Sequence, residues 1–394
     1  MGEAADPVVI VGMARTPMGA FQGSLRDVTA PELGSVAIRA AIERAAVPSE
    51  DIDETVMGCV LPAGLGQAPA RQAALGAGIP HSCGAVTVNK VCGSGMKALM
   101  LGHDEIAAGT IDVVVAGGME SMSNAPYLLK RARSGYRMGH GALIDHMFLD
   151  GLEDAYDTGR LMGSFAEECA EAYQFTREAQ DSYAVTSLNR ARKAVDGGTF
   201  DTEIVAVSAA KGRAEVNRDE QPEKASPERI PSLRPAFREN GTVTAASSAS
   251  ISDGAAALVL MRRSAAERRG LTPLAVLVAH ATHSQSPNLF ATAPIGALRK
   301  LSERAGWRLA DVDLFEVNEA FAVVPMAVMR DLDIPHDKMN IHGGACALGH
   351  PIGASGARIV VTLLAALERY DLKRGMAAVC LGGGEATAMA VERI

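Results

Sequence analysis

The 394-residue sequence has few aromatic residues and little excess of positive charge. Aromatic residues make up 4% of it, with one tryptophan, and 38 lysines and arginines face 46 aspartates and glutamates. Its net charge is −8, and the one short basic cluster is at 130–133 (KRAR). A chain without an extended basic block is not expected to bind nucleic acid.

Long apolar runs and targeting signals are also missing. No stretch of eighteen apolar residues exists, so no membrane partner is expected. Residues 1–6 (MGEAAD) lack the apolar core of a signal peptide, and the last four residues (VERI) do not match a peroxisomal address. Six cysteines lie at 59, 83, 92, 169, 346 and 380, without a paired framework or zinc-type spacing. We therefore expect free thiols, no metal and a cytoplasmic location.

What the sequence does contain is a repeated alternation of strand and helix patterns. It is 48% apolar and holds 40 glycines, and its length exceeds what one hydrophobic core usually organises. Strands are predicted at 8–12, 56–61, 85–88, 112–116, 255–261, 274–280, 314–317 and 376–381. Helices are predicted at 32–46, 70–75, 93–107, 165–171, 177–195, 294–305, 319–330 and 355–368. This order indicates an α/β fold with a largely parallel sheet.

The alternation stops between about 121 and 250 and then resumes. This middle region holds polar loops, two helices and a Pro- and charge-rich stretch at 218–235. Its length favours an inserted loop domain over a simple surface excursion. We expect an N-terminal half at 1–120 plus 250–272, the insertion at 121–249, and a C-terminal half at 273–394.

The two halves look duplicated. SGMK at Ser94 and SGAR at Ser355 each open a predicted helix, at an offset of 261 residues (94 to 355). GGME at 117–120 resembles GGGE at 382–385, at an offset of 265 (117 to 382). Two similar offsets in the same order predict a repeated domain, with both small-residue helices packed closely about a pseudo-twofold axis. Loops at the strand ends of both halves would then meet in one crevice, where open α/β sheets bind ligands.

Cys92 lies at the turn between a predicted buried strand and a helix. A thiol at a helix N-terminus is expected to ionise more readily, and the thiolate is the nucleophilic form. Gly93 and Gly95 leave room for a substrate near the backbone. The alternative is a small buried cysteine with only a packing role.

Three further residues could carry chemistry. His350 lies in a glycine-rich loop just before a helix, which suits a general base better than most lone histidines. Cys380 ends a buried strand and is followed by three glycines, so it is either a core residue or a second reactive thiol. Asn318 either caps the next helix or holds a water or substrate oxygen through its amide.

Four stretches together resemble the signature blocks of the thiolase family, in that family's order. They are 89–98 (NKVCGSGMKA), 318–322 (NEAFA), 349–358 (GHPIGASGAR) and 380–384 (CLGGG). Further matches occur at 241–245 (GTVTA) and 252–257 (SDGAAA), so the resemblance spans the chain. It implies a five-layer fold of two duplicated α/β domains with an inserted loop domain. It also implies coenzyme A thioesters as substrates, no cofactor, and a homo-oligomer, with a tetramer of two dimers favoured by 136–139 (YRMG).

The resemblance implies a role for each candidate residue. Cys92 would carry the acyl group as a thioester after His350 accepts its proton. Cys380 would exchange a proton with the α-carbon of the second acyl-CoA. Backbone N–H groups of Cys92 and Gly382 would form one oxyanion hole, and His350 with a water on Asn318 the other.

Substrate contacts are expected at Met162, Lys224, Ser248, Ser250 and Phe321, although the sequence departs from the family there. Leu-Met-Gly at 161–163 replaces the His-Met-Gly that is common in short-chain members. Ala249 stands where relatives often have the serine that touches the pantetheine, so Ser248 or Ser250 would substitute for it. Glu223 takes the place of a basic residue toward the nucleotide phosphate, which leaves Lys224 as its substitute.

The expected activity is the reversible condensation of two acetyl-CoA molecules to acetoacetyl-CoA and CoA. A thiolase of fatty-acid breakdown with a broader chain-length range is the first alternative. A decarboxylating ketosynthase is disfavoured by the second cysteine, Cys380. A non-catalytic acyl-CoA-binding protein on the same fold is a remote alternative, because it should have lost catalytic side chains.

Overall fold

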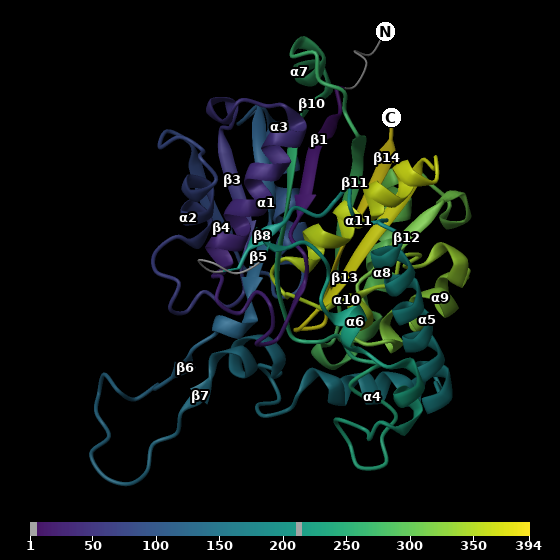
Figure 1. The fold of residues 1–394 in the computed structure, drawn as a ribbon. Coiled ribbons are helices and arrows are strands. Elements are labelled where there is room, and N and C mark those ends of the chain that lie inside the picture. The colour runs from purple at the N-terminus through teal and green to yellow at the C-terminus, as the bar shows by residue number, and fades with distance from the viewer. Residues whose placement is uncertain (1–5, 210–214) are drawn as a thin grey trace.

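The computed structural model describes residues 6–209 and 215–394, and a ten-stranded mixed sheet runs through it (Figure 1). The order of nine strands is β12-β13-β14-β11-β1-β10-β5-β3-β4, and β2 pairs with β10. Their bounds are β1 Val8–Arg15, β2 Gly19–Ala20, β3 Glu54–Gly58, β4 Gly84–Val88, β5 Val113–Ser121, β10 Ser252–Arg262, β11 Ala275–Ser284, β12 Leu314–Val317, β13 Arg374–Leu381 and β14 Glu385–Arg393.

The sheet repeats one topology in its two halves. β3 runs parallel to β4 and β5, and β12 runs parallel to β13 and to a bridge at Met339. β5, β10 and β1 then pair antiparallel in turn, as do β13, β14 and β11. In the sheet, the two halves meet where β1 pairs antiparallel with β11, at Val9–Val276 and Ile10–Ala275. The expected duplication is confirmed, but a largely parallel sheet was wrong, because β10 and β14 return antiparallel. The expected domain boundaries stay predictions.

The two halves of the sheet form two layers, and helices form three more. The outer layer on the N-terminal half is α1 (Ala30–Ala45) with α2 (Pro69–Gly76). α8 (Ala293–Ala305) and α9 (Val323–Leu332) cover the C-terminal half. α3 (Ser94–Ala108) and α11 (Ser355–Arg369) share a core with strands of both halves, so they form the middle layer. The five-layer expectation is therefore met, and the start of α3 faces the start of α11.

The two middle helices approach so closely that only glycine fits at their contact. A Cβ on Gly356 would lie 2.5 Å from the backbone nitrogen of Met96, and one on Gly95 would lie 2.9 Å from that of Ala357. Real Cβ atoms essentially never come so near a backbone atom. The expected close packing of the two small-residue helices is thus observed, and it sets the loops before both helices side by side.

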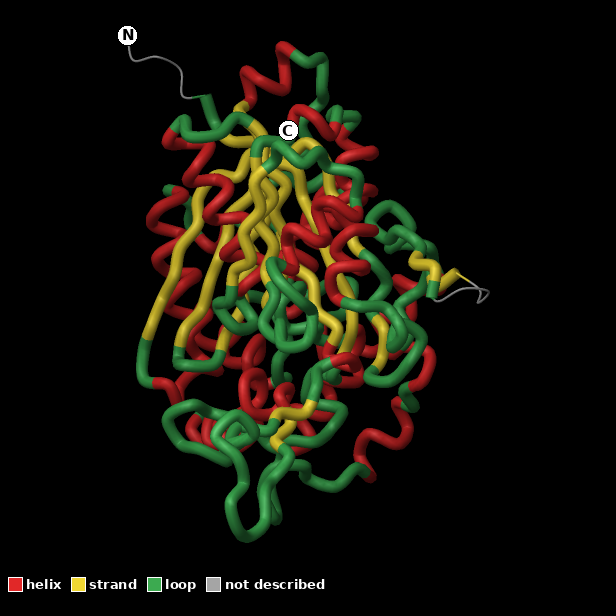
Figure 2. The backbone as a smooth tube through the Cα atoms, turned by 90° about the vertical axis from the view of Figure 1, so that its left-hand side faces the viewer, coloured by secondary structure: helices red, strands yellow, loops and turns green. Residues whose placement is uncertain are grey.

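The segment between β5 and β10 covers the lower end of the sheets (Figures 1 and 2). Its described elements include β6 (Tyr127–Leu128), β7 (Ile144–Asp145), α4 (Met162–Ala172), α5 (Arg177–Asp196), β8 (Val207–Ser208), β9 (Glu215–Val216) and α6 (Gln221–Lys224). The chain between β6 and β7 projects below the body in both views. Among the described helices, none is long and apolar enough to span a membrane.

Several local expectations were wrong. β4 is an edge strand rather than a buried one, and its Val86 is 41% exposed. β5 continues through Gly117 and Gly118 instead of turning there. Both positions require glycine because a Cβ on either would lie 2.0 Å from a carbonyl oxygen of a neighbouring segment. α9 begins only at Val323, so Asn318 does not cap it. β14 was not predicted, because its alternating small residues lack a strong apolar pattern.

Substituting Gly356→Ala should destabilise the fold. The new methyl would collide with the α3 backbone, and this should outweigh the better helix propensity of alanine, giving a net loss of about 1–3 kcal/mol in the free energy of unfolding. Denaturant unfolding measures it. Gly84→Ala is the control, because its Cβ would meet no atom nearer than 3.8 Å, and should stay within about 0.5 kcal/mol of wild type. Equal stability of both variants would contradict the close approach.

Candidate active site

One small cavity gathers most of the predicted site residues. Its volume is about 80 Å³ and it is mostly apolar. Cys92, His350, Cys380, Gly382, Met162 and Phe321 line it, together with Gly151, Leu152, Ala249, Phe290, Ala320, Ile352 and Leu381. The cavity thus combines the α3 turn, the loop before α11, the end of β13 and the inserted segment. Six of the ten predicted site residues come together here.

Cys92 is held on a tight and strained turn. Val91 has a φ of +45°, a conformation that β-branched residues rarely adopt. Gly93 follows, where a Cβ would lie 2.4 Å from the Leu381 side chain. The turn therefore places Cys92 two residues before the first residue of α3, where Leu381 of the C-terminal half packs against Gly93.

The Cys92 thiol is nevertheless protonated at rest. Burial raises its pKa to about 12, although its own backbone N–H and that of Gly382 act in the opposite direction. The charge of Glu120 raises the pKa further. The prediction that the helix N-terminus would favour the thiolate was wrong in direction, because desolvation of the half-buried sulfur outweighs the dipole. A base is then needed to activate Cys92.

His350 has the tautomer that such a base requires. Its Nδ1 lies 2.6 Å from Ser355 Oγ, and that hydroxyl donates to the Pro351 carbonyl at 3.0 Å. Because the single hydroxyl proton goes to Pro351, Nδ1–H donates to Ser355 and Nε2 keeps its lone pair. Burial, with the nearby charge of Arg358, lowers the His350 pKa to about 3. The imidazole is therefore neutral at physiological pH.

Asn318 lies against His350. Its Nδ2 is 3.5 Å from both ring nitrogens, so the amide sits over the ring face rather than on either lone pair. Its Oδ1 is buried without a hydrogen-bond partner. An unsatisfied buried acceptor of this kind is suited to a bound water.

Cys380 and Gly382 complete the cavity from the C-terminal half. Cys380 is fully buried at the end of β13, and burial, with a smaller effect of Cys92, raises its pKa well above the ordinary value. At Gly382 a Cβ would meet no atom nearer than 3.7 Å, so the cavity is open beside this glycine. Gly384 has a φ of +79°, which lets the chain turn back into β14.

The remaining predicted contacts lie outside this cavity. Lys224 and Ser250 line a larger surface cavity of about 360 Å³, together with Arg229, which was not predicted, and Lys224 also pairs with Glu220. Ser248 lines neither cavity, because it is buried and donates to the Thr244 carbonyl at 2.7 Å.

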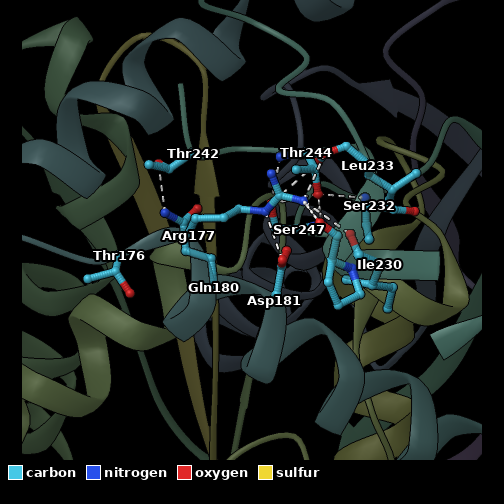
Figure 3. A network of polar contacts seen from close by, with 12 residues as sticks. Thr176, Arg177, Gln180, Asp181, Ile230, Ser232, Leu233, Thr242, Thr244 and Ser247 are labelled. Atoms are coloured by element: carbon cyan, nitrogen blue, oxygen red, sulfur yellow. Dashed lines mark hydrogen bonds and ion pairs between the residues drawn. The ribbon is translucent and has the colours of Figure 1, made fainter. Parts of the chain in front are cut away.

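Polar contacts join α5 to the chain that precedes Ser248, at residues 230–233 and at Thr242 (Figure 3). Arg177 pairs with Asp181 and donates to the carbonyls of Ile230 and Leu233. Gln180 donates to Thr242 at 2.8 Å. These bonds hold Ile230, Leu233 and Thr242 against α5.

Two buried carboxylates near the site were not singled out from the sequence. Glu319 accepts hydrogen bonds from Tyr183, Ser187, Asn340 and the Cys346 backbone. Glu120 accepts from the backbones of two other loops. A signal was present, since each acidic residue stands among mostly small and apolar residues (GGMES and NEAFA), but the sequence does not show which donors they meet.

No metal-ligand cluster occurs among the described residues that line the cavity. His103, Asp104 and His280 form the one such group found in residues 6–209 and 215–394. They lie on the later part of α3 and on β11, and both imidazoles already hydrogen-bond to the Asp104 carboxylate.

The fold and the four motifs define a family. The thiolase N-terminal domain matches residues 8–264 and the thiolase C-terminal domain matches residues 271–393. The chain belongs to the thiolase family.

Several relatives are similar over nearly their whole length. Acetyl-CoA acetyltransferase 2 of Arabidopsis thaliana is 52% identical, with 99% of this chain and 98% of that protein covered. Cytosolic acetyl-CoA acetyltransferase of Mus musculus is 48% identical, with 100% of both covered. The crystal structure of Acat5 thiolase from Ascaris suum in complex with coenzyme A has a TM-score of 0.94 and 41% identity, covering 98% of this chain and 100% of that one.

Alkylation of Cys92 should report its raised pKa. The rate with iodoacetamide, followed by peptide mass spectrometry, should keep rising with pH beyond about pH 9, because an ordinary cysteine is half ionised near 8.5 and this thiol is harder to ionise. A plateau below about pH 8 would show a thiolate already present at rest and contradict the raised pKa of Cys92.

Proposed function

We propose that this protein is an acetyl-CoA C-acetyltransferase, which interconverts two acetyl-CoA with acetoacetyl-CoA and CoA. The observation that carries the proposal is the meeting of Cys92, His350 and Cys380 at one small cavity. Two thiols and one neutral imidazole are what an acyl-transfer step and a proton transfer to carbon require. The names of the relatives support the same activity.

In the cleavage direction, Cys92 attacks the ketone carbon of acetoacetyl-CoA while its proton passes to Nε2 of His350. The bond between the acetyl carbon and the α-carbon breaks. The departing acetyl-CoA carbanion takes the proton of Cys380, and the acetyl group stays on Cys92 as a thioester. A thiol whose pKa is raised is protonated and ready for this step.

The second step restores the enzyme. The thiol of coenzyme A gives its proton to the Cys380 thiolate and attacks the acetyl-Cys92 carbonyl. Cys92 leaves and regains its proton from His350, so one acetoacetyl-CoA and one CoA give two acetyl-CoA. Condensation is the reverse sequence.

Two groups of donors would stabilise the oxyanions. The backbone N–H groups of Cys92 and Gly382 both act on the Cys92 sulfur in the free protein, so they are placed to meet a carbonyl oxygen bound there. His350 and a water held by Asn318 would meet the enolate oxygen. These donors stabilise each negative charge that develops on an oxygen during the reaction. We therefore propose that the reaction needs no metal or redox cofactor.

Chain length is the open choice between the two catalytic functions. The lining of the cavity of about 80 Å³ includes the large side chains of Met162, Phe290 and Phe321. This space suits a four-carbon acyl group better than a long one, which favours acetoacetyl-CoA over a broader range. A non-catalytic acyl-CoA-binding protein is disfavoured, because the three catalytic side chains are all present.

We assign the rest of coenzyme A to the surface cavity that Lys224, Ser250 and Arg229 line. It is the larger of the two cavities, and its two basic side chains suit the phosphates of the nucleotide. Ala249 lines the inner cavity and Ser250 the outer one, so neighbouring residues of one loop reach both. Ser248 contributes through its position in this loop rather than through its hydroxyl.

We further propose a homotetramer built from two dimers. β4 is the last strand of the sheet, and its Val86 is exposed, so a second copy could extend the sheet there. The segment projecting between β6 and β7 exposes apolar side chains, with Met138 at 95% and Leu143 at 67%. Exposed apolar residues on a projecting segment favour contact with a second dimer.

A cytoplasmic location fits the six free cysteines and the name of the cytosolic mouse relative.

The first test is CoA-dependent cleavage of acetoacetyl-CoA and of a C8 3-ketoacyl-CoA, with EDTA present. Wild type should cleave the C4 substrate, and it should cleave the C8 substrate far more slowly than the C4 substrate. Cys92→Ala and Cys380→Ala should each lose at least about a thousandfold in kcat/KM, because neither step has another thiol. Cys83→Ala, a buried cysteine outside the cavity, is the control. Comparable C8 cleavage would favour the broader alternative, and an active Cys92→Ala variant would overturn the mechanism.

The second test concerns assembly. Met138→Asp combined with Leu143→Asp should convert a tetramer into dimers in light scattering after size-exclusion chromatography, because charges would replace the apolar contact. Ile394→Asp, another exposed apolar side chain at the opposite end of the body, should leave the mass unchanged. A double variant that remains tetrameric would show that the projecting segment does not join the dimers.

A further inference from the structure

Glu120 holds together two loops that meet at the catalytic cavity. Glu120 lies within β5 rather than in a loop, and it is fully buried. Oε2 accepts the Val60 N–H at 3.0 Å and the Gly353 N–H at 2.9 Å. Oε1 accepts the Leu61 N–H at 3.1 Å and the Cys59 thiol at 3.6 Å. One carboxylate thus satisfies three backbone donors from both halves of the protein.

Each of these loops leads directly to a proposed catalytic residue. Gly353 lies three residues after His350, in the loop that α11 follows. The Val60 carbonyl accepts from the Asn89 side chain, whose own oxygen accepts the Val91 N–H just before Cys92. A continuous chain of hydrogen bonds therefore runs from the His350 loop through Glu120 to the Cys92 turn.

Apolar packing follows the same path. Val60, Leu61 and Ile352 form a small buried cluster with Met122 and Met147, and Cys92 packs against it. Val60 and Leu61 come from one Glu120-bound loop and Ile352 from the other. The carboxylate therefore fixes the surface on which the Cys92 side chain rests.

We propose that Glu120 is a positioning residue, which sets His350 against Cys92 across the two halves through its three backbone hydrogen bonds. The inference rests on the proposed function, since it names the alignment of that reaction's base and nucleophile. Glu120 need not touch substrate, and its effect comes through the loops that it joins. A small displacement of a base from its nucleophile can reduce the rate by about 100-fold.

The charge of Glu120 provides a second signature. It raises the pKa of Cys92, as stated above, and the pKa of Cys59. Burial raises the pKa of Glu120 itself to about 7, against the effect of its backbone donors. Within residues 6–209 and 215–394, Cys59 and Cys92 are titratable groups whose pKa this carboxylate raises. A neutral residue at 120 should therefore let Cys92 ionise at lower pH.

Glu120→Gln tests the proposal, because it keeps the shape but turns one oxygen into a donor facing backbone N–H groups. We expect kcat for acetoacetyl-CoA cleavage to fall by about 10- to 100-fold with little change in KM. We also expect the alkylation profile of Cys92 to shift to lower pH. Loss of a reactive thiol would slow turnover without making Cys92 ionise at lower pH. The two changes together therefore separate the proposed role of Glu120 from such a loss.

Glu120→Asp and Cys59→Ala separate charge, reach and packing. Aspartate keeps the charge but is too short to reach all three donors, so kcat should fall while the alkylation profile stays near that of wild type. Cys59→Ala keeps the carboxylate and its backbone partners, so both readouts should stay near wild type. Circular dichroism and light scattering establish that each variant folds and assembles.

The outcomes distinguish this proposal from the proposed function. If wild type cleaves acetoacetyl-CoA and Glu120→Gln retains kcat within about twofold, with an unchanged alkylation profile, Glu120 does not position the site. If Glu120→Gln and Glu120→Asp both shift the alkylation profile, general loosening rather than charge is responsible, and the proposal is overturned. If wild type itself cleaves no 3-ketoacyl-CoA, the proposed function fails, while the alkylation profiles still test Glu120.

Discussion

The close contact of α3 and α11 is the constraint on which the site depends. With glycine at Gly95 and Gly356, the two helices approach until backbone meets backbone. The turn before one helix carries Cys92, and the loop before the other carries His350. A pair of duplicated domains that packed through larger side chains would hold these residues farther apart. The active cavity is thus a consequence of how two small-residue helices meet.

Burial governs the chemistry of this cavity more than the helix N-terminus does. It raises the pKa of the Cys92 and Cys380 thiols and lowers the pKa of His350, which disfavours an ion pair among these three side chains at rest. In the proposed reaction, protons move only when substrate is bound and its developing negative charge meets the N–H groups of Cys92 and Gly382. This arrangement protects a site with two thiols from ionising, and hence from side reactions, in the absence of substrate.

Much of the fold and the centre of the site could be predicted from sequence, because motifs at Cys92, His350 and Cys380 have local signatures. The duplication was visible in two similar offsets. Strand direction was not, because the return of β10 and β14 depends on pairing with distant strands. The Cys92 pKa was predicted in the wrong direction, since desolvation depends on the other half of the chain. Glu120 escaped notice because its donors, Val60 and Gly353, are backbone groups remote in sequence.

The inserted segment leaves and re-enters the sheet at neighbouring residues. Ser121 at the end of β5 pairs with Asp253 near the start of β10, and the Asp253 carboxylate also accepts from Ser123 at 2.6 Å. Both stems of a segment of more than a hundred residues are therefore fastened at a single point. Such a layout lets the covering segment differ in length between relatives without disturbing the sheet register. The cover is not free to tilt about these stems, because the buried Arg15 of β1 also pairs with Glu203 and Asp219 of the inserted segment, at 2.8 Å to each.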